Sequence, residues 1–275
     1  MSAERPLAPF GRRLAPVSAR EQHGAYVVLR CLDGEGPIPK AGQFYMLSSA
    51  ARWGGGQGER PFLPRAFSVL RAGRDQSGVL ELQFLVEDVG PGTNRLCELG
   101  PGDGLLLVGP FGNGFSPPRE GRAAMLVGGG VGIAPLAILQ DQLGAVATLP
   151  LLGFRDGAHA EGARLLQSPR VATDDGSAGH EGLVTELLLE ELAAAAEELE
   201  VFACGPPAML EAVRAICAEH AVPAQLALES GMACGFGACF GCAIPVRGGY
   251  IRLCVDGPVL DATLLETGAA AGAHR

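Results

Sequence analysis

ESGMACGFGACFGCAIPVRGGYIRLC, residues 229–254, holds four of the chain's eight cysteines. Three of them, Cys234, Cys239 and Cys242, follow the spacing C-x4-C-x2-C, and Cys254 ends the stretch. This spacing is typical of a loop that wraps a [2Fe–2S] cluster, in which two irons and two sulfides take four thiolates. The stretch therefore predicts an iron–sulfur site near the C-terminus.

Three glycines lie between these cysteines: Gly235, Gly237 and Gly241. A loop that coils closely around a cluster needs positive φ angles or positions without a side chain, and glycine provides both. Such a loop also points backbone N–H groups at the sulfurs, which helps to set the reduction potential. We expect this loop to supply three ligands and Cys254 to supply the fourth.

Other uses of four cysteines fit the pattern less well. Structural zinc sites usually have two separated C-x2-C pairs, whereas this stretch has one C-x2-C and one C-x4-C. Disulfides require an oxidising compartment, and the sequence has no visible secretory signal. Buried thiols without a ligand would leave the dense glycines unexplained. Zinc is the main alternative at this point.

Length, composition and charge limit the remaining possibilities. The chain has 275 residues, 48% of them hydrophobic, which suffices for two compact domains or for one domain and a small module. Its net charge is −9 and no basic stripe is present, which argues against nucleic acid as a partner. No apolar run approaches the length of a membrane span, and residues 1–13 lack a hydrophobic core. We expect a cytoplasmic protein without a membrane partner.

Residues 14–112 have the pattern of a small antiparallel barrel. Short apolar or alternating runs, separated by turn residues, occur at 26–31, 43–48, 65–70, 79–87 and 104–112. Five or six strands at this spacing suggest a barrel. The insert ARWGGGQGERPF, residues 51–62, is rich in glycine and is predicted to be a mobile loop.

The pattern changes after Pro117-Pro118. The sequence predicts strand, glycine turn and helix over 123–143, a strand over 148–156, a possible strand and a polar loop over 163–182, a helix over 183–199, and strand, turn and helix over 200–220. This alternation predicts a parallel sheet with helices on its faces. The expected fold class is multidomain, β plus α/β, with a barrel domain at 1–117, an α/β domain at 118–224, and a cysteine-rich module with a disordered Gly/Ala tail at 225–275.

Two segments of the barrel region have residues suited to a pyrophosphate. PRAFS, residues 64–68, offers the forked and permanently charged donors of Arg65. VGPGT, residues 89–93, leads into a helix start with free N–H groups near Gly92 and Thr93. Each segment alone is equally consistent with a solvated strand end or a plain helix cap. Their order, ahead of a glycine-rich βα turn, favours nucleotide binding.

LVGGGVGIAPL, residues 126–136, joins a predicted strand to a predicted helix through glycines that let a nucleotide approach the backbone. Cys204, in ACGPPAML, lies at the carboxyl end of another predicted strand, where open α/β sheets bind ligands. A tight turn without a ligand and a buried thiol are the alternatives. No acidic residue follows at the usual Rossmann distance, which disfavours the standard ribose contact. Asp174, Asp175 and Ser177 form a polar loop that suits a ribose or a helix cap.

The other reactive side chains suggest no further site. Cys31, Cys97 and Cys217 lie in apolar or helical runs and are expected to be core residues. The five histidines share no cluster with carboxylates, and no Gly-x-Ser-x-Gly elbow is present. We expect no catalytic side chain.

The motifs together are similar to those of one family. From about Leu14 to Asp261 the chain resembles the electron-transfer subunits of class B dihydroorotate dehydrogenases, within the ferredoxin–NADP reductase superfamily. The resemblance is carried by PRAFS, VGPGT, LLVGPFGNGF, LVGGGVGIAPL, TDDGSAGHEGLVT, CGPPAML, ESGMACGFGACFGC and CVDGPVLDA. The last two motifs mark this subunit and its near relatives, whereas the others mark the superfamily.

The resemblance implies an FAD-binding β-barrel, a Rossmann-like nucleotide-binding domain and a [2Fe–2S] module. It places FAD on Arg65, Ala66, Phe67, Ser68, Leu85, Val86, Glu87, Gly92 and Thr93. It places NAD(H) beside Gly128, Gly129, Gly130, Gly132, Cys204 and Gly205, and the cluster on Cys234, Cys239, Cys242 and Cys254. Relatives usually have proline where this chain has Ala66, and the insert at 51–62 departs from the usual length.

The implied mechanism converts a two-electron donor into a source of single electrons. NADH releases a hydride and a cluster accepts one electron, so a flavin has to lie between them. The family's partner is the FMN-containing dihydroorotate dehydrogenase catalytic subunit, which makes orotate for pyrimidine synthesis in a 2:2 complex. Similar subunits serve ferredoxin:NAD(P) oxidoreductases, sulfide dehydrogenases and hydrogenases, and a zinc-stabilised binding module is a further alternative. Arg155 suits a 2′-phosphate of NADPH, whereas the family favours NADH.

Overall fold

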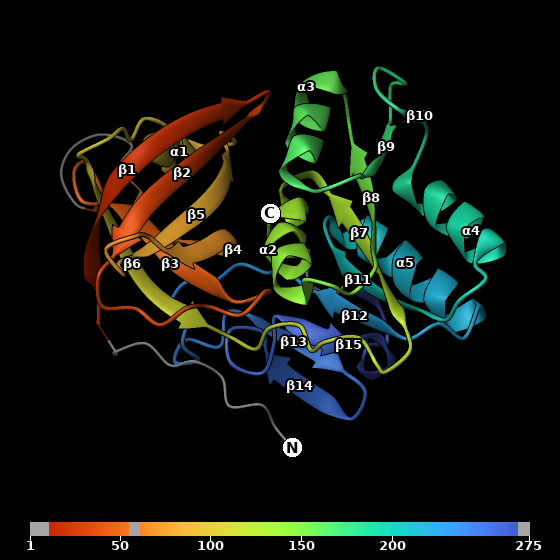
Figure 1. Cartoon of the computed structure of the whole chain (residues 1–275). Helices are drawn as coiled ribbons and strands as arrows, with labels where there is room; N and C mark the ends of the chain where they lie inside the picture. The colour runs from red at the N-terminus through yellow and green to blue at the C-terminus, as the bar shows by residue number, and fades with distance from the viewer. Residues whose placement is uncertain (1–10, 55–60, 269–275) are drawn as a thin grey trace.

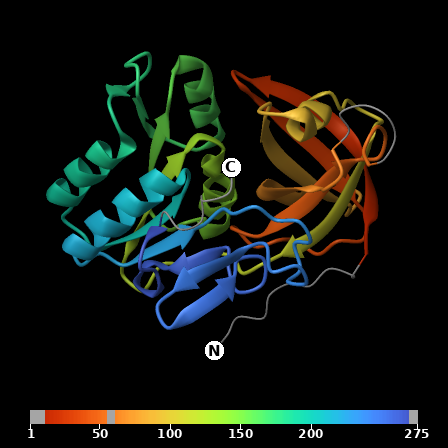
Figure 2. The same ribbon diagram turned by 180° about the vertical axis from the view of Figure 1, so that it is seen from behind.

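The computed structural model describes residues 11–54 and 61–268. A β-barrel and an α/β sheet lie side by side, and the cysteine-rich module lies beneath both (Figures 1 and 2). Two hydrophobic cores hold these parts together. One joins the barrel interior to the near side of the α/β sheet, and the other joins the outer face of the barrel to the cysteine-rich module and the far side of the sheet.

The barrel has six antiparallel strands, as expected. They are β1 (Arg13–His23), β2 (Tyr26–Asp33), β3 (Phe44–Ser49), β4 (Arg65–Arg74), β5 (Leu80–Glu87) and β6 (Gly104–Phe111), closed in the order β1-β2-β5-β4-β3-β6. Side chains alternate across the wall because successive residues of a strand point to opposite faces. Tyr45 and Leu47 belong to the core that fills the barrel, whereas Phe44 and Met46 belong to the core shared with the cysteine-rich module.

A short helix and a buried ion pair complete the barrel. Helix α1 (Pro91–Cys97) follows β5 and buries Leu96 in the barrel core. Arg13 donates from Nε and Nη2 to the two carboxylate oxygens of Asp33, at 2.9 and 2.7 Å, and Nη2 also donates to the carbonyl of Gly109. The bidentate geometry and the third acceptor satisfy most of a charge pair that is more than nine-tenths buried.

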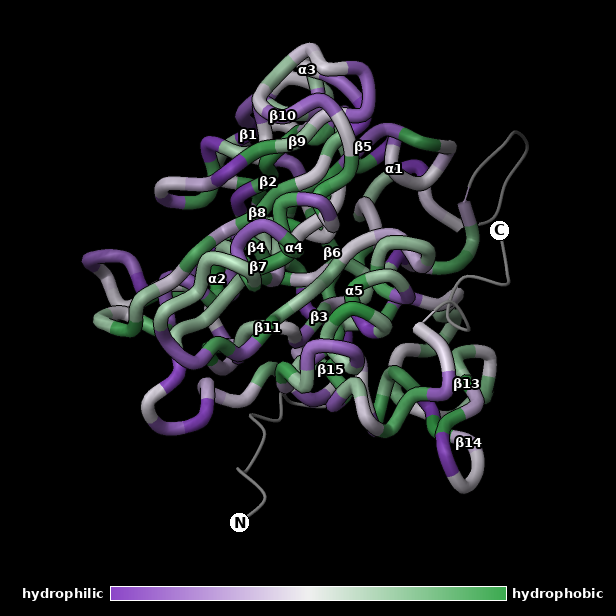
Figure 3. The backbone as a smooth tube through the Cα atoms, turned by 90° about the vertical axis from the view of Figure 1, so that its right-hand side faces the viewer, coloured by the Kyte–Doolittle hydropathy of each residue, from purple (hydrophilic) through white to green (hydrophobic). Residues whose placement is uncertain are grey.

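The α/β sheet has seven strands. In spatial order they are β10 (His180–Glu181), β9 (Arg170–Thr173), β8 (Thr148–Phe154), β7 (Ala123–Gly129), β11 (Leu199–Cys204), β12 (Ala224–Ala227) and β15 (Val259–Asp261). All neighbouring strands are parallel except β12 and β15. The central strands are largely hydrophobic, as buried parallel strands are (Figure 3).

Helices cover both faces of this sheet. They are η1 (Gly130–Gly132), α2 (Ile133–Leu143), α3 (Gly157–Ala160), η2 (Glu161–Leu165), α4 (Val184–Ala194) and α5 (Pro207–Glu219). Helix α2 lies between the sheet and β4 of the barrel, and its residues 133–140 are all buried (Figure 1). Because both neighbours of α2 are apolar, its exposed residues are confined to the C-terminal end, at Asp141 and Gln142.

The helix predicted over 183–199 is shorter than expected. Helix α4 ends at Ala194, and β11 already begins at Leu199. The helix buries Val184, Leu187 and Leu188, but only alanine and glutamate lie between Leu192 and the start of the strand at Leu199. Alanine and glutamate favour a helix, yet a surface helix also needs an apolar face to pack.

The C-terminal residues leave the α/β sheet and return to it. After β12 comes the cysteine loop, then a hairpin of β13 (Ala243–Val246) and β14 (Gly249–Arg252), and then β15 followed by η3 (Ala262–Leu264). Strand β15 pairs antiparallel with β12, Gln225 opposite Asp261. The expected border at residue 224 falls inside the strand pairing of the α/β sheet, so the module is anchored to that sheet at both ends.

Several expectations concern residues outside the described part. The mobility predicted for the insert at 51–62 depends mostly on residues 55–60, and the predicted tail at 268–273 lies almost wholly beyond Gly268. No helix in the part of the chain that the structure describes is long and apolar enough to cross a membrane.

Candidate functional site

The cysteine loop coils as two of its three glycines predicted, whereas Gly241 has neither a positive φ nor a close contact. Gly235 and Gly237 have φ angles of 79° and 91°, in the left-handed region that glycine adopts without strain. Gly235 also packs against the barrel, because a Cβ atom there would lie 2.6 Å from Cγ of Met46. At Gly237 a Cβ atom would lie 2.6 Å from Cγ2 of Val255. The loop is therefore pressed between β3 and the turn after β14, which carries Cys254.

The four cysteines lie in two pairs. The Sγ atoms of Cys242 and Cys254 are 3.1 Å apart and both side chains are buried. Cys234 and Cys239 share a hydrogen bond, and Cys239 is exposed. Within residues 11–54 and 61–268 no three or more His, Cys, Asp or Glu side chains converge on a single ion position. Two pairs suit a binuclear cluster, which takes two ligands on each iron, better than one tetrahedral zinc.

The electrostatics of the pairs also suit a positively charged centre. Burial raises the pKa of Cys234, but hydrogen bonds from the backbone of Cys239 and Phe236 outweigh it and lower the pKa to about 6. Burial and the adjacent Cys242 raise the pKa of Cys254 to about 12. Two buried thiolates this close repel each other unless a cation lies between them, and iron supplies that cation while keeping the ligands deprotonated. The residues present therefore fit an iron–sulfur cluster.

Aromatic side chains surround the exposed end of the loop. Phe236 packs against Phe111 of β6, with ring centroids 6.5 Å apart. Phe240 and Tyr250 are 63% and 79% exposed, and the guanidinium of Arg252 lies 5.0 Å from the centroid of the Phe240 ring. The cysteine loop thus has one face on the barrel and one aromatic face open to solvent.

The structure brings Arg65 and Gly92 together. A Cβ atom at Gly92 would lie 2.8 Å from Nε of Arg65, so the guanidinium lies directly over the glycine. The hydroxyl of Thr93 accepts from the N–H groups of Val89 and Gly90 and donates to the carbonyl of Gly90, so it caps α1. A permanently charged guanidinium therefore lies beside the first turn of α1, and Thr93 keeps the shape of that turn.

The remaining residues expected at the flavin lie on the adjacent strands β4 and β5. Ala66 is exposed, Phe67 and Ser68 are partly buried, and Phe67 packs against the barrel core. Leu85 and Val86 have fully buried side chains, so only their backbone faces outward. Glu87 ends β5 and turns towards the α/β sheet, where it meets Arg155.

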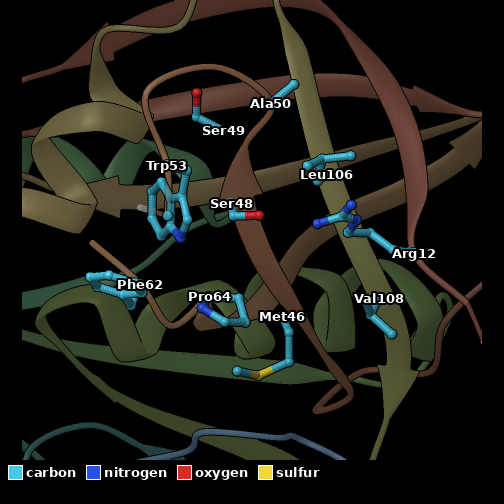
Figure 4. Close-up of a pocket in the computed structure, with 11 residues that line it drawn as sticks. Arg12, Met46, Ser48, Ser49, Ala50, Trp53, Phe62, Pro64, Leu106 and Val108 are labelled. Atoms are coloured by element: carbon cyan, nitrogen blue, oxygen red, sulfur yellow. The ribbon is translucent and has the colours of Figure 1, made fainter. Parts of the chain in front are cut away.

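A hollow on the outer face of the barrel adjoins this region, and the sequence did not indicate it. Its volume is about 390 Å³, and Figure 4 shows the side chains around it. The lining residues come from β3, β6, the N-terminal end of β1 and the insert: Arg12, Met46, Ser48, Ser49, Ala50, Trp53, Gly54, Phe62, Pro64, Leu106 and Val108. The Trp53 ring lies 6.0 Å from the guanidinium of Arg65, and its buried indole N–H has no hydrogen-bond partner among the described residues. The signal in the sequence that could have indicated this hollow is the tryptophan, Trp53, in the glycine-rich insert.

The glycine turn after β7 meets the turn after β11. A Cβ atom at Gly132 would lie 2.4 Å from the carbonyl oxygen of Cys204, and one at Gly129 would lie 2.8 Å from Cδ of Pro206. Cys204 pairs with Gly128. Burial raises the pKa of Cys204 well above its usual range, so this residue is a neutral thiol. The structure therefore assembles Gly128–Gly132, Cys204 and Gly205 into one surface at the carboxyl edge of the sheet.

A charged cluster connects the barrel to the α/β sheet. Nη2 of Arg155 lies 2.7 Å from Oε1 of Glu87, and His159 lies between Glu87 and Asp156, at 3.2 and 2.6 Å. Tyr26 packs edge-on against His159, with ring centroids 5.5 Å apart. The sequence pointed to Glu87 and Arg155 separately, but it did not indicate His159 or the link between them, because they lie far apart in the chain.

Comparison with known proteins identifies the family. Residues 229–266 match the model of the iron–sulfur cluster binding domain of dihydroorotate dehydrogenase B. The electron transfer subunit of dihydroorotate dehydrogenase B (NAD(+)) from Caldanaerobacter subterraneus subsp. tengcongensis is 39% identical over 82% of this chain and 87% of its own length. The probable equivalent from Methanopyrus kandleri is 36% identical over 94% and 93%.

Solved structures agree with this fold. The structure of the NADH-dependent reduced ferredoxin-NADP oxidoreductase has a TM-score of 0.76 at 25% identity and covers 94% of this chain and 92% of its own. A ferredoxin NADP+ reductase from Neisseria gonorrhoeae has a TM-score of 0.57 at 18% identity, over 76% of this chain and 91% of its own. The fold, the paired cysteines and the near full-length relatives together show that this chain belongs to the family of dihydroorotate dehydrogenase B electron transfer subunits.

Proposed function

We propose that this chain takes electrons from NADH onto FAD and passes them through a [2Fe–2S] cluster to the catalytic subunit of a dihydroorotate dehydrogenase B. The observation that carries the proposal is the cysteine loop. Its four thiols form two pairs, and the loop packs through Gly235 onto Met46 of the barrel. The loop that would hold the one-electron centre is therefore in van der Waals contact with the domain expected to hold the flavin.

Bound FAD would accept a hydride from NADH and return the electrons one at a time to the cluster. For this FAD we assign the pyrophosphate to Arg65 and the backbone of Gly92, because the guanidinium already lies over that glycine. Permanently charged Arg donors suit a pyrophosphate. Ala66, Phe67 and Ser68, with the backbone of Leu85 and Val86, would line the flavin along β4 and β5.

For NADH we assign the surface made by Gly128–Gly132, Cys204 and Gly205. The close contacts at Gly129 and Gly132 pack the two turns together, whereas Gly130 has open space beside its backbone at the carboxyl edge of the sheet, where nucleotides bind in open α/β folds. Cys204 contributes its backbone and a neutral, buried thiol. The hydride step then needs no side-chain acid or base, and the work of the protein is to position two rings.

The cluster ligands in this proposal are Cys234, Cys239, Cys242 and Cys254. The partner would approach the exposed side of the loop, because electron transfer requires the two redox groups to be close and Cys239 is the exposed ligand. Phe240 and Tyr250 on this side are largely exposed, and aromatic residues are enriched at protein interfaces.

The larger assembly is also part of the proposal. The partner is an FMN-containing catalytic subunit that makes orotate, the complex is a 2:2 heterotetramer, and the site of action is the cytoplasm. Residues 1–117 would bind FAD, residues 118–224 would bind NADH, and residues 225–275 would hold the cluster. The names of the relatives, which are electron transfer subunits of dihydroorotate dehydrogenase B, support the presence of a catalytic partner.

The cofactor content tests the proposal directly. We expect freshly isolated protein to contain about two irons and two acid-labile sulfides per FAD, and NADH to bleach both the flavin and the cluster absorbance. Zinc without sulfide, or no bleaching by NADH, would refute it.

A second partner is favoured by one observation. The NADH-dependent reduced ferredoxin-NADP oxidoreductase is similar over nearly the whole chain. An equivalent subunit of a ferredoxin:NAD(P) oxidoreductase would have the same cofactors and a different acceptor. Co-purification with an FMN-containing dihydroorotate dehydrogenase favours the first choice, and co-purification with another oxidoreductase subunit favours the second.

A further inference from the structure

Arg155 is the first residue after β8, at the carboxyl edge of the parallel sheet. Gly153 pairs with Gly129 of β7, so Arg155 stands level with the turn Gly130–Gly132 in the neighbouring connection. That turn packs on Cys204 and has no charged side chain. A charged donor for a nucleotide bound there has to come from an adjacent strand end.

The two residues that follow each of β7, β8, β9, β11 and β12 are all described, and Arg155 is the only cation among them. The others include four carboxylates, from Asp156, Asp174, Asp175 and Glu229. A dinucleotide carries two negative charges on its pyrophosphate. A sheet edge with more carboxylates than cations would repel these charges unless a cation lies close by. Arg155 is the residue in that place.

The guanidinium is oriented from the barrel side. Nη2 is held by Glu87 at 2.7 Å, and Nε donates to His159 at 3.3 Å. The side chain is nevertheless 62% exposed, and Nη1 makes no hydrogen bond to any residue that the structure describes. The forked end of Arg155 is therefore fixed on one side and free to bind on the other.

We propose that Arg155 binds the pyrophosphate of NADH through its free Nη1 side, and that Glu87 positions it for this. The inference rests on the proposed function, in that NADH is the electron donor. It adds a binding residue on β8 to the glycine surface, and it makes Glu87 a positioning residue shared by the two nucleotide-binding regions. The acidic strand ends around Arg155 also disfavour a second phosphate, which is why we assign Arg155 to the pyrophosphate and not to the 2′-phosphate of NADPH.

The test uses holoprotein with Arg155→Ala, Arg155→Lys or Arg164→Ala. Arg164 is a matched control, because it lies in η2 nearby, is 75% exposed and, among residues 11–54 and 61–268, forms its one ion pair with Glu161. ADP-ribose, which has the pyrophosphate but no nicotinamide, is titrated by calorimetry, and KM and kcat are measured for NADH and NADPH with ferricyanide as acceptor.

For Arg155→Ala we expect the affinity for ADP-ribose to fall about tenfold or more and KM for NADH to rise similarly, with FAD content unchanged. Arg155→Lys should lose less affinity than Arg155→Ala, because lysine keeps the positive charge but lacks the forked N–H donors of the guanidinium. Arg164→Ala should behave as wild type.

Three results would overturn the assignment. The first is an ADP-ribose affinity of Arg155→Ala within about twofold of wild type, and the second is an equal loss of ADP-ribose affinity in Arg164→Ala. The third is a rise in KM that is confined to NADPH, which would place a 2′-phosphate at Arg155. Wild-type holoprotein that binds no ADP-ribose and is not reduced by NADH would instead refute the proposed function, and this inference with it.

Discussion

Single glycines decide how closely the cysteine loop fits its surroundings. Gly235 and Gly241 lie in the same loop but differ in two respects. Gly235 has a positive φ and a missing Cβ that would press on Met46, whereas Gly241 has neither, and its nearest contact would be Sγ of Cys239 at 3.6 Å. Alanine at Gly241 adds a methyl group alone, whereas alanine at Gly235 adds the same group at a positive φ and against Met46. Comparing the two variants isolates the effect of backbone geometry and packing.

Gly235→Ala is expected to destabilise the folded state and loosen the cluster. A left-handed alanine costs about 1–2 kcal/mol, and the contact with Met46 adds to that. The thermal unfolding midpoint and the iron content after gel filtration should both fall. Gly241→Ala should change neither measurably. Equal iron content and equal midpoints in the two variants would contradict the tight packing of the loop on β3.

Among the elements, α5 holds the end of the described chain. Glu211 accepts from Arg214 in the same helix, at 2.7 and 2.9 Å, and from Thr267 and the N–H of Gly268. These bonds, that from Arg214 above all, lower the pKa of Glu211 from 4.5 to about 2. The carboxylate therefore ties residues after η3 back to α5.

This tie predicts a pH-dependent contribution to stability. Because the pKa of Glu211 is lower in the folded state, its contribution is fully present above about pH 4.5 and is lost as the pH falls towards 2. Glu211→Gln should lower the free energy of unfolding, measured with urea at pH 6, by less than about 1 kcal/mol, since the pair is partly exposed. The difference from wild type should shrink by pH 3.

Glu219 provides the control for this measurement. It lies exposed in the last turn of α5 and makes no hydrogen bond or ion pair with the described residues. Glu219→Gln should leave the midpoint unchanged at every pH. If Glu211→Gln lowered the free energy of unfolding by the same amount from pH 6 to pH 3, the ionised carboxylate of Glu211 would not be what holds this segment to α5.

At the scale of the whole molecule, local patterns predicted most of the fold. The alternating runs predicted β2 to β6 within a few residues but included no run for β1, and the strand–glycine–helix run at 123–143 predicted β7, η1 and α2. The iron–sulfur module predicted from the cysteine spacing, and the resemblance of the motifs to one family, are confirmed by the match to the iron–sulfur domain and by the relatives. Each of these signals lies within a short window of sequence.

What the sequence did not indicate is long-range. Three such contacts join residues far apart in the chain. They are the strand pairing of Gln225 with Asp261, the ion pair of Glu87 with Arg155, and the edge-on contact of Tyr26 with His159. The hollow beside Trp53 likewise needs β3, β6 and the insert together. Periodicity describes which face of one element is buried, but it does not specify which distant residue covers that face.

The central claim is that four thiolates hold an iron–sulfur cluster on the electron path between flavin and partner. Cys239 is the exposed member of the four cysteines, so its removal should disturb the fold least. The decisive measurement compares two rates in Cys239→Ala holoprotein: reduction of its flavin by NADH, and delivery of electrons to the catalytic subunit. We predict flavin reduction at close to the wild-type rate and loss of delivery. Delivery at the wild-type rate would contradict the account.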